Sequence, residues 1–570
     1  RIIVVGGRTG RDGLRGATFS SLTMDAQTGQ VAGASVQIGD PITEKGTIEV
    51  VERARDAGLY NAITDCGAGG LSSAVGEMGE HLGAFVDLAK VPLKYAGLEP
   101  WEIWLSEAQE RMVLAVPHEN LSALEEICDT YWVEMSDIGY FGMNGSKLKV
   151  VHGEIPVVNL DMPFLHACPR LELEAEISQS PNYPIENQQS AFSNLYSPFS
   201  NSQLLLTLLS HPNIASKENI IRVYDHEVRG MTIVKPLAGV CADAPSDAAV
   251  MKPLETKGWK GFVLANGINP LIGEVNPYAM AVSAVDEAIR NSVAVGADPD
   301  RIAILDNFCW GNPRRPETLG LLVEAARGCY DAALQYGTPF ISGKDSLNNE
   351  YLGSDGQRHA IPGTLLISSI GIHPDVRKAV TMDLKEPGNV LYLVGDFQPF
   401  VMGSHAFQIG GSDFFVQDSY QLPITNYQLS MRTPMVYRAL HRAIHAGAVR
   451  AAHDLSEGGL AVAAAEMCIG GRLGAELDLS TLRPANHVRR SRQAFNFQPS
   501  TVLFAETNGC LLVEVSPENV QAFEKGFADL PSRKIGQVTA DARLTVFHDG
   551  LNVLEIEVNE CVRAFCGSNM

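Results

Sequence analysis

The chain has 570 residues, too many for one hydrophobic core, so we expect three or four domains. Hydrophobic residues make up 45% and charged residues 19% of it, as in a folded globular protein, and the formal charge of −22 argues against a broad nucleic-acid-binding surface. No apolar run approaches the roughly 20 residues of a membrane span and no signal peptide opens the chain, so we expect a cytoplasmic protein that uses no membrane. The ten cysteines include no CxxC pair, which favours reduced, mostly buried thiols over a zinc or redox motif.

The first segment, RIIVV at positions 1–5, is typical of a strand, and a glycine-rich loop, GGRTGRDGLRGA at 6–17, follows it. Such a loop can approach a phosphate closely. It lacks the GxxxxGK[ST] pattern, and its spacing does not fit the dinucleotide GxGxxG pattern. A tight structural turn therefore explains the loop equally well.

The decapeptide AITDCGAGGL at 62–71 returns as AAHDLSEGGL at 451–460. At the same offset of 389 residues, the Val-Gly of the first strand and a Glu-Met pair downstream also match. Valine-containing runs alternate with amphipathic helical patterns around both copies. We therefore predict two homologous α/β or α+β domains, at 1–165 and 385–570.

Within the repeat, Asp65 corresponds to Asp454, and each lies just before a Gly-Gly-Leu helix start. Backbone N–H groups at such a start suit an anion, and the carboxylate could hold a hard cation beside it. An acidic helix N-cap is the commoner explanation for a lone aspartate. Because the aspartate recurs with its surroundings, we favour a metal ligand. His453 corresponds to Thr64, so we interpret that histidine as a packing residue.

A stretch rich in Ser, Asn, Gln and Pro predicts a linker at 166–215, and a different domain follows at 216–375. In that middle domain, residues 281–299 form a helical pattern that places Glu287 and Asn291 four residues apart on one face. A carboxylate and an amide oxygen there could ligate Mg²⁺. Exposed polar residues on a helix would look the same.

Later in the middle domain, the segment ISGKDSLNNE at 341–350 predicts the end of a strand. We expect Gly343 to end the strand and Lys344, Asp345 and Ser346 to lie at its tip.

Taken together, nine segments carry a resemblance to a known family: GGRTGRDGLRGATFSS, VQIGDPITEK, DCGAGGLSSA, SEAQERM, YDHEVRG, PSDAAV, DNFCWGNP, GKDS and HDLSEGGLAVA. They closely resemble the synthetase component of phosphoribosylformylglycinamidine synthase. The resemblance implies domains like those of aminoimidazole ribonucleotide synthetase, in the order C-type, N-type, C-type, with an α+β or α/β fold. It also implies that the two quoted decapeptides are the same turn in two C-type domains.

The resemblance implies an activity in purine synthesis, in which ATP and ammonia convert the amide of formylglycinamide ribonucleotide into an amidine through an iminophosphate. It also implies a second, auxiliary nucleotide site that holds ATP or ADP as a structural group. By this resemblance, the substrate-binding residues are Gln37, Glu107, Gln109 and Ser346, the nucleotide-binding residues are Asp306, Gly343 and Ser456, and the Mg²⁺ ligands are Asp65, Asp247, Glu287, Asn291 and Asp454.

An alternating repeat that starts with a C-type domain leads us to expect one more N-type domain before Arg1. The catalytic histidine of the family belongs to that domain, so we assign no catalytic residue in this chain. The chain has no GxCxG-like glutaminase segment. Ammonia should therefore come from a glutaminase subunit or domain, and a small accessory subunit is a further partner that the resemblance allows.

Three alternatives to this interpretation stay open. The chain could be a non-catalytic scaffold half that docks a glutaminase. Aminoimidazole ribonucleotide synthetase and selenophosphate synthetase are closer rivals, but the double C-type domain argues against both. Two residues depart from the pattern of small family members, because Lys344 replaces an Asn and Ala108 replaces a Ser, and the metal role of position 344 is in doubt.

Overall fold

The computed structural model describes residues 1–14, 16, 23–25, 28, 38–167, 170–177, 200–223, 227, 230–274, 276–398, 430–482 and 499–567. The chain divides into two compact units, the first made of Arg1–Glu174 with Ser346–Ala360 and the second of Ala175–Asp345 with Ile361–Met570. Gln37 and residues 168–169 and 178–199 of the predicted linker lie outside the described residues. None of the described helices has the length and apolarity needed to cross a bilayer.

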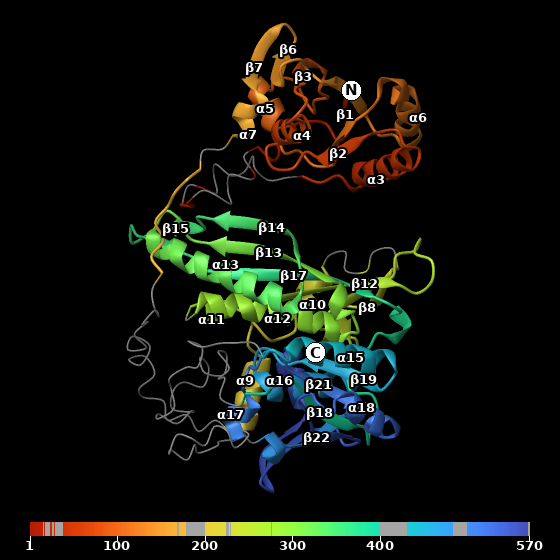
Figure 1. The fold of residues 1–570 in the computed structure, drawn as a ribbon, viewed down its shortest axis with the longest axis vertical. Helices are drawn as coiled ribbons and strands as arrows, with labels where there is room; N and C mark the ends of the chain where they lie inside the picture. The colour runs from red at the N-terminus through yellow and green to blue at the C-terminus, as the bar shows by residue number, and fades with distance from the viewer. Residues whose placement is uncertain are drawn as a thin grey trace. The chain divides into compact units, whose positions relative to one another are not determined.

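The first unit is built on a seven-stranded sheet in the order β2-β4-β1-β5-β3-β6-β7 (Figure 1). The strands are β1 (Ile2–Gly6), β2 (Ala62–Asp65), β3 (Ala84–Asp87), β4 (Arg111–Ala115), β5 (Met135–Phe141), β6 (Lys147–His152) and β7 (Ile155–Asp161). The helices are α3 (Pro41–Asp56), α4 (Leu71–Met78), α5 (Pro100–Leu105), α6 (Leu121–Tyr131) and α7 (Met162–His166), and a hairpin of β15 (Glu350–Leu352) and β16 (Arg358–Ala360) completes the unit.

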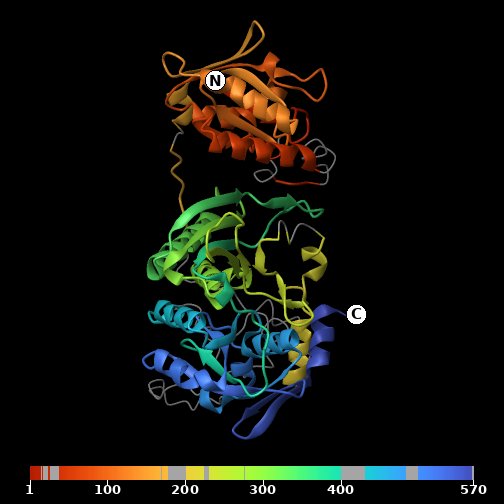
Figure 2. The same cartoon turned by 90° about the vertical axis from the view of Figure 1, so that its right-hand side faces the viewer.

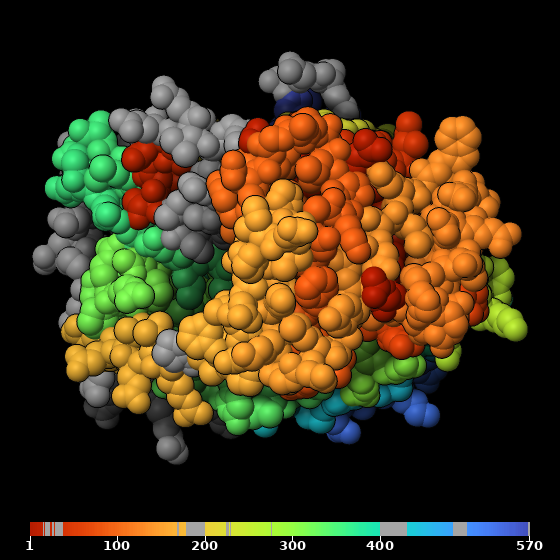
Figure 3. All heavy atoms as spheres, turned by 90° about the horizontal axis from the view of Figure 1, so that it is seen from above, coloured from red at the N-terminus to blue at the C-terminus, as the bar shows by residue number. Residues whose placement is uncertain are grey.

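Side chains of β1 alternate between two cores, as the two-residue period of a strand requires. Ile2 and Val4 join the cluster that α4 and α5 cover, whereas Ile3 and Val5 join the cluster that α3 and α6 cover. The sheet therefore has helices on both faces. Figure 3 draws the heavy atoms of this unit as spheres, with its second half in orange.

The middle domain, in the second unit, has a six-stranded sheet in the order β14-β13-β17-β12-β11-β8. These strands are β8 (Thr232–Val234), β11 (Ala249–Met251), β12 (Gly261–Ile268), β13 (Ile302–Trp310), β14 (Phe340–Leu347) and β17 (Thr364–His373). A separate two-stranded sheet is formed by β9 (Leu237–Ala238) and β10 (Ala244–Pro245). Helices α10 (Glu218–Ile221), α11 (Pro270–Gly273), α12 (Pro277–Ala294) and α13 (Pro316–Tyr336) belong to the same region.

Helix α12 is the predicted helix of the middle domain, and the structure confirms it. The side chain of Asn276 accepts a hydrogen bond from the backbone N–H of Ala279, and Pro277 occupies the first turn, so the start is well capped. Nearly every residue of α12 is buried, because the helix packs against the sheet, α13 and the repeat domain that follows (Figure 1).

The second repeat domain has a seven-stranded sheet in the order β19-β21-β18-β22-β20-β23-β24. Its strands are β18 (Val390–Val394), β19 (Val449–Asp454), β20 (Gly474–Asp478), β21 (Leu511–Val515), β22 (Ser532–Thr539), β23 (Arg543–His548) and β24 (Leu551–Glu557). The helices are α15 (Thr433–His445), α16 (Gly459–Gly471), α17 (Pro499–Leu503), α18 (Val520–Gly526) and α19 (Val558–Cys566), and α9 (Asn201–Leu209) packs against α19, which Figure 2 shows as a yellow helix beside a dark blue one.

The two repeat sheets agree strand for strand. Each has one parallel pair, β3 with β6 and β20 with β23, and all its other pairs are antiparallel. The register shift of the first strand matches too, between Ile2 and Ile3 in one copy and between Leu391 and Tyr392 in the other, whereas a shift between Val449 and Ala451 of β19 has no counterpart in β2. The predicted duplication is therefore a duplication of the whole fold.

One local prediction is wrong. Strand β14 continues to Leu347, so Gly343, Lys344, Asp345 and Ser346 lie inside the strand and not at its tip. An edge strand needs hydrogen bonds on one side only and tolerates polar side chains, so the polar run does not end it.

Candidate active site

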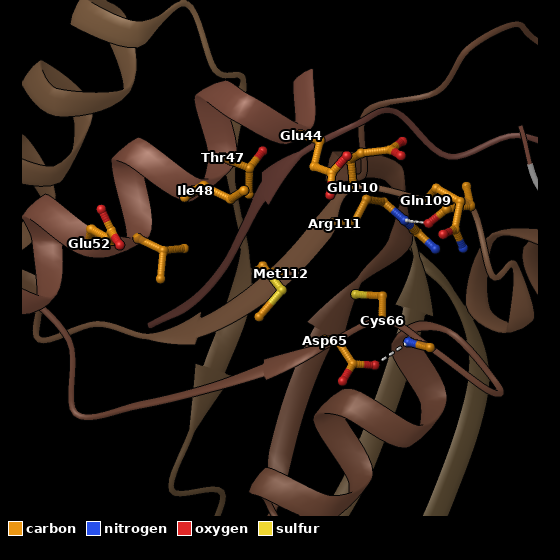
Figure 4. A pocket seen from close by; sticks show the side chains of 13 residues that line it. Glu44, Thr47, Ile48, Glu52, Asp65, Cys66, Gln109, Glu110, Arg111 and Met112 are labelled. Carbon is orange, nitrogen blue, oxygen red and sulfur yellow. Dashed lines mark hydrogen bonds between the residues drawn. The ribbon is translucent and has the colours of Figure 1, made fainter. Parts of the chain in front are cut away.

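The first unit holds a pocket of about 500 Å³ between α3, β2 and β4 (Figure 4). Helix α3 contributes Glu44, Thr47 and Ile48 to its wall, and Asp65 lies at the opposite wall, at the end of β2. Helix α3 takes this position because Asp40 caps it, accepting hydrogen bonds from the two backbone N–H groups of its first turn, and because its buried side chains pack on the sheet. The pocket is partly open, with acidic side chains at its rim.

Of the predicted site residues in this unit, Asp65 and Gln109 line the pocket and Glu107 lies buried beside it. Asp65 is exposed, and its Oδ1 accepts a hydrogen bond of 2.7 Å from the backbone N–H of Gly67. Glu107 Oε1 accepts one of 3.3 Å from the backbone N–H of Gly69, and the Gln109 side chain donates to the Glu107 carbonyl. The structure thus ties the glycine turn after β2 to the segment before β4.

Arg111 is a further residue of this site that the sequence analysis missed. Its guanidinium is buried and donates to Thr9 Oγ1 at 2.7 Å, to the Ala108 carbonyl at 3.0 Å and to the Ser106 carbonyl. Burial lowers the pKa of this guanidinium. Arg111 therefore holds the backbone around Glu107 in place. Its position as the first residue of a strand carries no sequence signal for that role.

Asp306 and Gly343 lie on neighbouring strands of the middle domain, β13 and β14. A Cβ atom at position 343 would lie 2.0 Å from Asp306 Oδ1, so any other residue there would force this carboxylate to move. Burial, and secondarily Asp345, raises the pKa of Asp306. Ser346, on the same strand as Gly343, is buried and belongs to the first unit.

The second unit has a pocket of about 150 Å³. Five predicted residues line it together: Asp247, Glu287, Asn291, Asp454 and Ser456. They come from the segment before β11, from α12, and from the end of β19 with the turn that follows. The structure therefore gathers the whole predicted auxiliary set in one place.

Three oxygen atoms of this pocket have no hydrogen-bond partner in the described part of the chain, Ser246 Oγ, Asp247 Oδ2 and Asn291 Oδ1. The other polar atom of the Asp247 side chain and that of the Asn291 side chain each form a hydrogen bond. Asp247 Oδ1 accepts from the backbone N–H of Asp454 at 2.9 Å, and the Asn291 amide donates to the Asn266 carbonyl at 3.1 Å. A buried oxygen without a partner is costly, and carboxylate and amide oxygens are what Mg²⁺ prefers, so these atoms fit a divalent cation.

Glu287 faces the same pocket from α12. Its Oε2 accepts a hydrogen bond of 3.0 Å from the backbone N–H of Ile268. Burial raises its pKa well above the usual value, and the neighbouring carboxylates Glu457 and Asp454 raise it further. A pocket with this many buried acidic groups favours a cation.

Arg290 supplies the main positive charge at this site, and the sequence analysis missed it. Its fully buried guanidinium donates to Asp454 Oδ2 at 3.0 Å, to Ser456 Oγ at 3.0 Å and to Asp286. Burial lowers the pKa of Arg290, but Asp286 and Asp454 raise it more, well above its usual value. Arg290 therefore joins α12 to the second repeat domain.

The interpretation of His453 as a packing residue is wrong. Its ring nitrogens contact Asp247 Oδ1 at 3.0 Å and Glu466 Oε2 at 2.9 Å, and potential ligand atoms of Asp247, His453 and Asp454 lie within 4.8 Å of one another. Burial lowers the pKa of His453, but the two carboxylates raise it well above its usual value. Asp247 is 206 residues away in the chain, so no local pattern could reveal this contact.

Comparisons with known proteins place the chain in a class. The C-terminal domain model of AIR synthase related proteins matches residues 1–150 and 386–549, and the N-terminal domain model matches residues 245–365. The chain therefore belongs to the AIR synthase related proteins. The predicted order of C-type, N-type and C-type domains and the α+β fold class are confirmed, whereas the exact limits of the domains stay a prediction.

Individual relatives narrow the class to one family. Phosphoribosylformylglycinamidine synthase subunit PurL of Thermoplasma acidophilum is 31% identical over 98% of this chain and 69% of the relative, and that of Deinococcus radiodurans is 34% identical over 96% and 69%. A Thermotoga maritima PurL structure, titled as complexed with FGAR, has a TM-score of 0.62 and 23% identity, and the match covers 94% of this chain and 71% of that one, which supports the fold. The chain belongs to the PurL family of phosphoribosylformylglycinamidine synthase subunits, which are ligases of purine biosynthesis.

Proposed function

We propose that this chain takes part in the ATP-dependent conversion of formylglycinamide ribonucleotide into formylglycinamidine ribonucleotide. The observation that carries the proposal is the pocket beside Asp65, which lies in a chain 31% identical to a PurL subunit over 98% of its length. Related solved structures are titled as T. maritima PurL complexed with FGAR, with ATP and with ADP. We extend those ligands to this chain on the strength of its family membership.

The proposed reaction proceeds through an iminophosphate. An amide oxygen is a poor leaving group, so transfer of the terminal phosphoryl group of ATP to that oxygen makes it displaceable. Ammonia then attacks the carbon, and phosphate leaves. A bound Mg²⁺ would neutralise charge on the phosphoryl group during transfer.

In this proposal, the residues of the first unit bind the substrate and the metal. Asp65 is exposed at the pocket wall, where a carboxylate can reach a cation. Glu107 and Gln109 are held beside it by the hydrogen bonds to Gly69 and to the Glu107 carbonyl, and Arg111 fixes the backbone between them. Such anchoring limits the freedom of substrate-positioning groups, which is where much of an enzyme's rate advantage arises.

The remaining substrate and nucleotide contacts are assigned by family resemblance. We assign Gln37 and Ser346 to the ribonucleotide and Asp306 and Gly343 to ATP. The structure adds that the missing side chain of Gly343 lets the Asp306 carboxylate lie against the neighbouring strand.

We assign the second pocket to an auxiliary nucleotide that is held with Mg²⁺ and does not turn over. Asp247, Glu287, Asn291 and Asp454 would ligate the cation, and Ser456 would contact the nucleotide. The support is that all five line one pocket, where Asp247 and Asn291 each present an unpartnered buried oxygen. A nucleotide bound there would stabilise the folded unit by mass action.

Ammonia for the reaction would come from a glutaminase subunit or domain, with a small accessory subunit as a further partner. The relatives are named as subunits of a synthase, and one structure with a similar fold is titled "Structure of PurLQS from Thermotoga maritima". We also propose that the assembly acts in the cytoplasm, where the pathway's soluble substrates would be available.

Turnover in the complete enzyme tests the first assignment. Asp65→Asn should lower formylglycinamidine formation by about 10- to 100-fold or more, because a metal-binding carboxylate is lost. Asp454→Asn should act mainly on stability and nucleotide retention. Equal turnover losses in both variants, with unchanged melting temperatures, would contradict the different roles that we assign to the two aspartates.

Nucleotide content tests the auxiliary site. Acid extraction of the purified chain followed by chromatography should release ADP or ATP, and titration with Mg²⁺ and ADP should show binding that Asn291→Ala weakens. Asp65→Asn serves as the matched control and should leave the extracted amount unchanged. Protein that contains no nucleotide and binds none in the presence of Mg²⁺ would refute the assignment.

A further inference from the structure

One residue at the pocket of the first unit has a backbone conformation that its side chain disfavours. Glu110, directly before β4, has a φ angle of 57°, in the left-handed region where glycine is common and other residues are rare. In the second repeat, β21 pairs with β18 in the same register as β4 pairs with β1, which places Gly509 at the matching position, with a φ angle of 74°. The first copy therefore carries a glutamate where the second carries the favoured glycine.

The turn before these strands explains why both copies adopt this conformation. An added Cβ atom at Gly6 would lie 1.9 Å from the Glu110 carbonyl oxygen, and one at Gly395 would lie 2.2 Å from the Gly509 carbonyl oxygen. The chain thus passes equally close in both copies, and the turn sets the φ angle. A residue other than glycine that is held in such a conformation is a candidate for a functional role.

The Glu110 side chain lies at the pocket beside Asp65. It lines this pocket, and Figure 4 shows it next to Glu44 of α3. Burial raises the pKa of Glu110, a hydrogen bond from the backbone N–H of Asp40 lowers it, and the nearby charge of Glu44 raises it again. The carboxylate is therefore half-buried at the pocket wall and is held there by the first residues of the helix.

The second repeat has no room for such a side chain. A Cβ atom at Gly509 would lie 3.0 Å from the side chain of Thr433 of α15, and the Gly509 N–H donates to Asp286 of α12 at 2.8 Å. A glutamate at this position would crowd α15. The glutamate is thus confined to the copy in which the matching space is a pocket.

We propose that the Glu110 carboxylate binds the ribonucleotide substrate by accepting hydrogen bonds from its uncharged donor groups, the ribose hydroxyls or the amide N–H groups. This inference rests on the proposed function of the pocket. The charge of the pocket selects that part of the substrate, because Glu44, Glu52 and Asp65 line it as well. Carboxylates repel the phosphate of a ribonucleotide but accept hydrogen bonds from hydroxyl and N–H donors.

Glu110→Gly separates a substrate-binding role from a structural one. Glycine relieves the disfavoured backbone conformation, so the melting temperature of the chain should rise by about 2–4 °C. In the complete enzyme, KM for formylglycinamide ribonucleotide should rise by about 10- to 100-fold with a smaller change in kcat, because a hydrogen bond to a charged group is lost. Glu110→Gln keeps the shape and removes the charge, so it should raise KM by a smaller factor.

Trp132→Gly is the matched control. Trp132 also has a positive φ angle, 59°, but it is 96% exposed at the end of α6 and does not line the pocket. Its substitution should raise the melting temperature by a similar amount and leave KM unchanged.

An unchanged KM in Glu110→Gly would overturn the proposal. If the melting temperature then falls, Glu110 is a structural anchor of α3, and if the Mg²⁺ concentration needed for turnover rises, its carboxylate is a cation ligand. The wild-type enzyme, measured beside the variants, separates this failure from that of the proposed function. A wild-type enzyme that forms no formylglycinamidine ribonucleotide would refute the proposed function, and this inference with it.

Discussion

The two repeat domains share strand order and turn geometry, yet the ends of their matching strands β2 and β19 differ in environment. Asp65 is exposed at the end of β2, whereas Asp454 is buried at the end of β19 and paired with Arg290. The difference arises because α12 of the middle domain packs against the second repeat. One backbone thus supports an exposed carboxylate in one copy and a buried, ion-paired one in the other.

The helices α15 and α3, which match in the two repeats, also differ in what they contact. In α15, the Tyr437 hydroxyl donates to Asp286 of α12 at 2.6 Å, and His441 contacts the Gly296 carbonyl. Their counterparts in α3 are Ile48, at the wall of the open pocket, and Glu52. The pocket of the first unit is therefore lined by residues whose counterparts contact a neighbouring domain, which explains why a duplicated surface is a cavity in one copy and an interface in the other.

The largest expected effect is a difference in stability between variants of the two aspartates. Asp454→Asn removes one partner of a buried ion pair and should cost about 3–5 kcal/mol of the free energy of unfolding. Asp65→Asn, at an exposed position, should change it by no more than about 0.5 kcal/mol. Native-state hydrogen exchange of the β19 and β2 amides measures each unit separately. Similar losses in both variants would contradict the difference in environment that we infer for the two aspartates.

The stability of the interface between the middle domain and α15 should depend on pH. His373 is buried, and its pKa is lowered to about 4, first by burial and then by His445 nearby. A histidine whose pKa is lower in the folded state takes up its proton mainly in the unfolded state, so stability falls as pH decreases from about 6.5 to about 4. The loss should reach about 3 kcal/mol.

Hydrogen exchange of α12 and α15 at pH 7 and at pH 4.5 would measure this loss, and His373→Phe should reduce it. The described residues of the first unit include no buried histidine, so its amides are the internal control. An equal response in both units would indicate that carboxylates, which both units contain, cause the loss of stability.

The shared glycine turn should respond equally in both copies. Gly70 and Gly459 have positive φ angles of 56° and 64°, and an added Cβ would lie 2.0 Å from the Ser106 carbonyl oxygen and 2.5 Å from that of Ala505. Substitution of either glycine by Ala should cost about 2 kcal/mol or more, by strain and by collision. Thermal unfolding measures the loss. Gly447→Ala, which also has a positive φ but open space around it, should cost less, about 1 kcal/mol.

The smallest effect concerns surface ion pairs. Arg438 of α15 pairs with Asp300 of the middle domain at 2.6 Å, whereas its counterpart Glu49 pairs with Lys45 and Arg53 of its own helix. Arg438→Ala should cost at most about 1 kcal/mol and Glu49→Ala about 0.3–0.5 kcal/mol. Both losses should shrink in high salt. A salt-insensitive loss at Arg438 would indicate packing and not charge.

Much of the fold was predictable because its signals are local. The strand at the start of the chain, the turn before each Gly-Gly-Leu helix and the helix around Glu287 each depend on residues close in sequence. The duplication could be recognised because both copies keep the same special backbone positions, such as Gly6 and Gly395 with positive φ. Strand β14 was misjudged at Gly343, since glycine marks a strand end in most contexts but here leaves space for Asp306.

The site was predictable in part. Resemblance to the family identified Asp247, Glu287, Asn291 and Asp454, and these line one pocket. The partners that hold them were not predictable. His453 and Arg290 reach carboxylates far away in the chain, and long-range contacts of this kind have no periodicity and no fixed spacing.

The sequence by itself determined that this protein is a duplicated C-type domain with a different domain between the copies, because a repeat and its glycine turns can be read without coordinates. Only the tertiary structure decided that Asp65 remains open to the pocket while Asp454 is closed by Arg290. The reason is physical: the character of a carboxylate depends on burial and on the charges around it, and both are set by the elements that pack against it. Those elements come from distant parts of the chain, so identical turns acquire different chemistry.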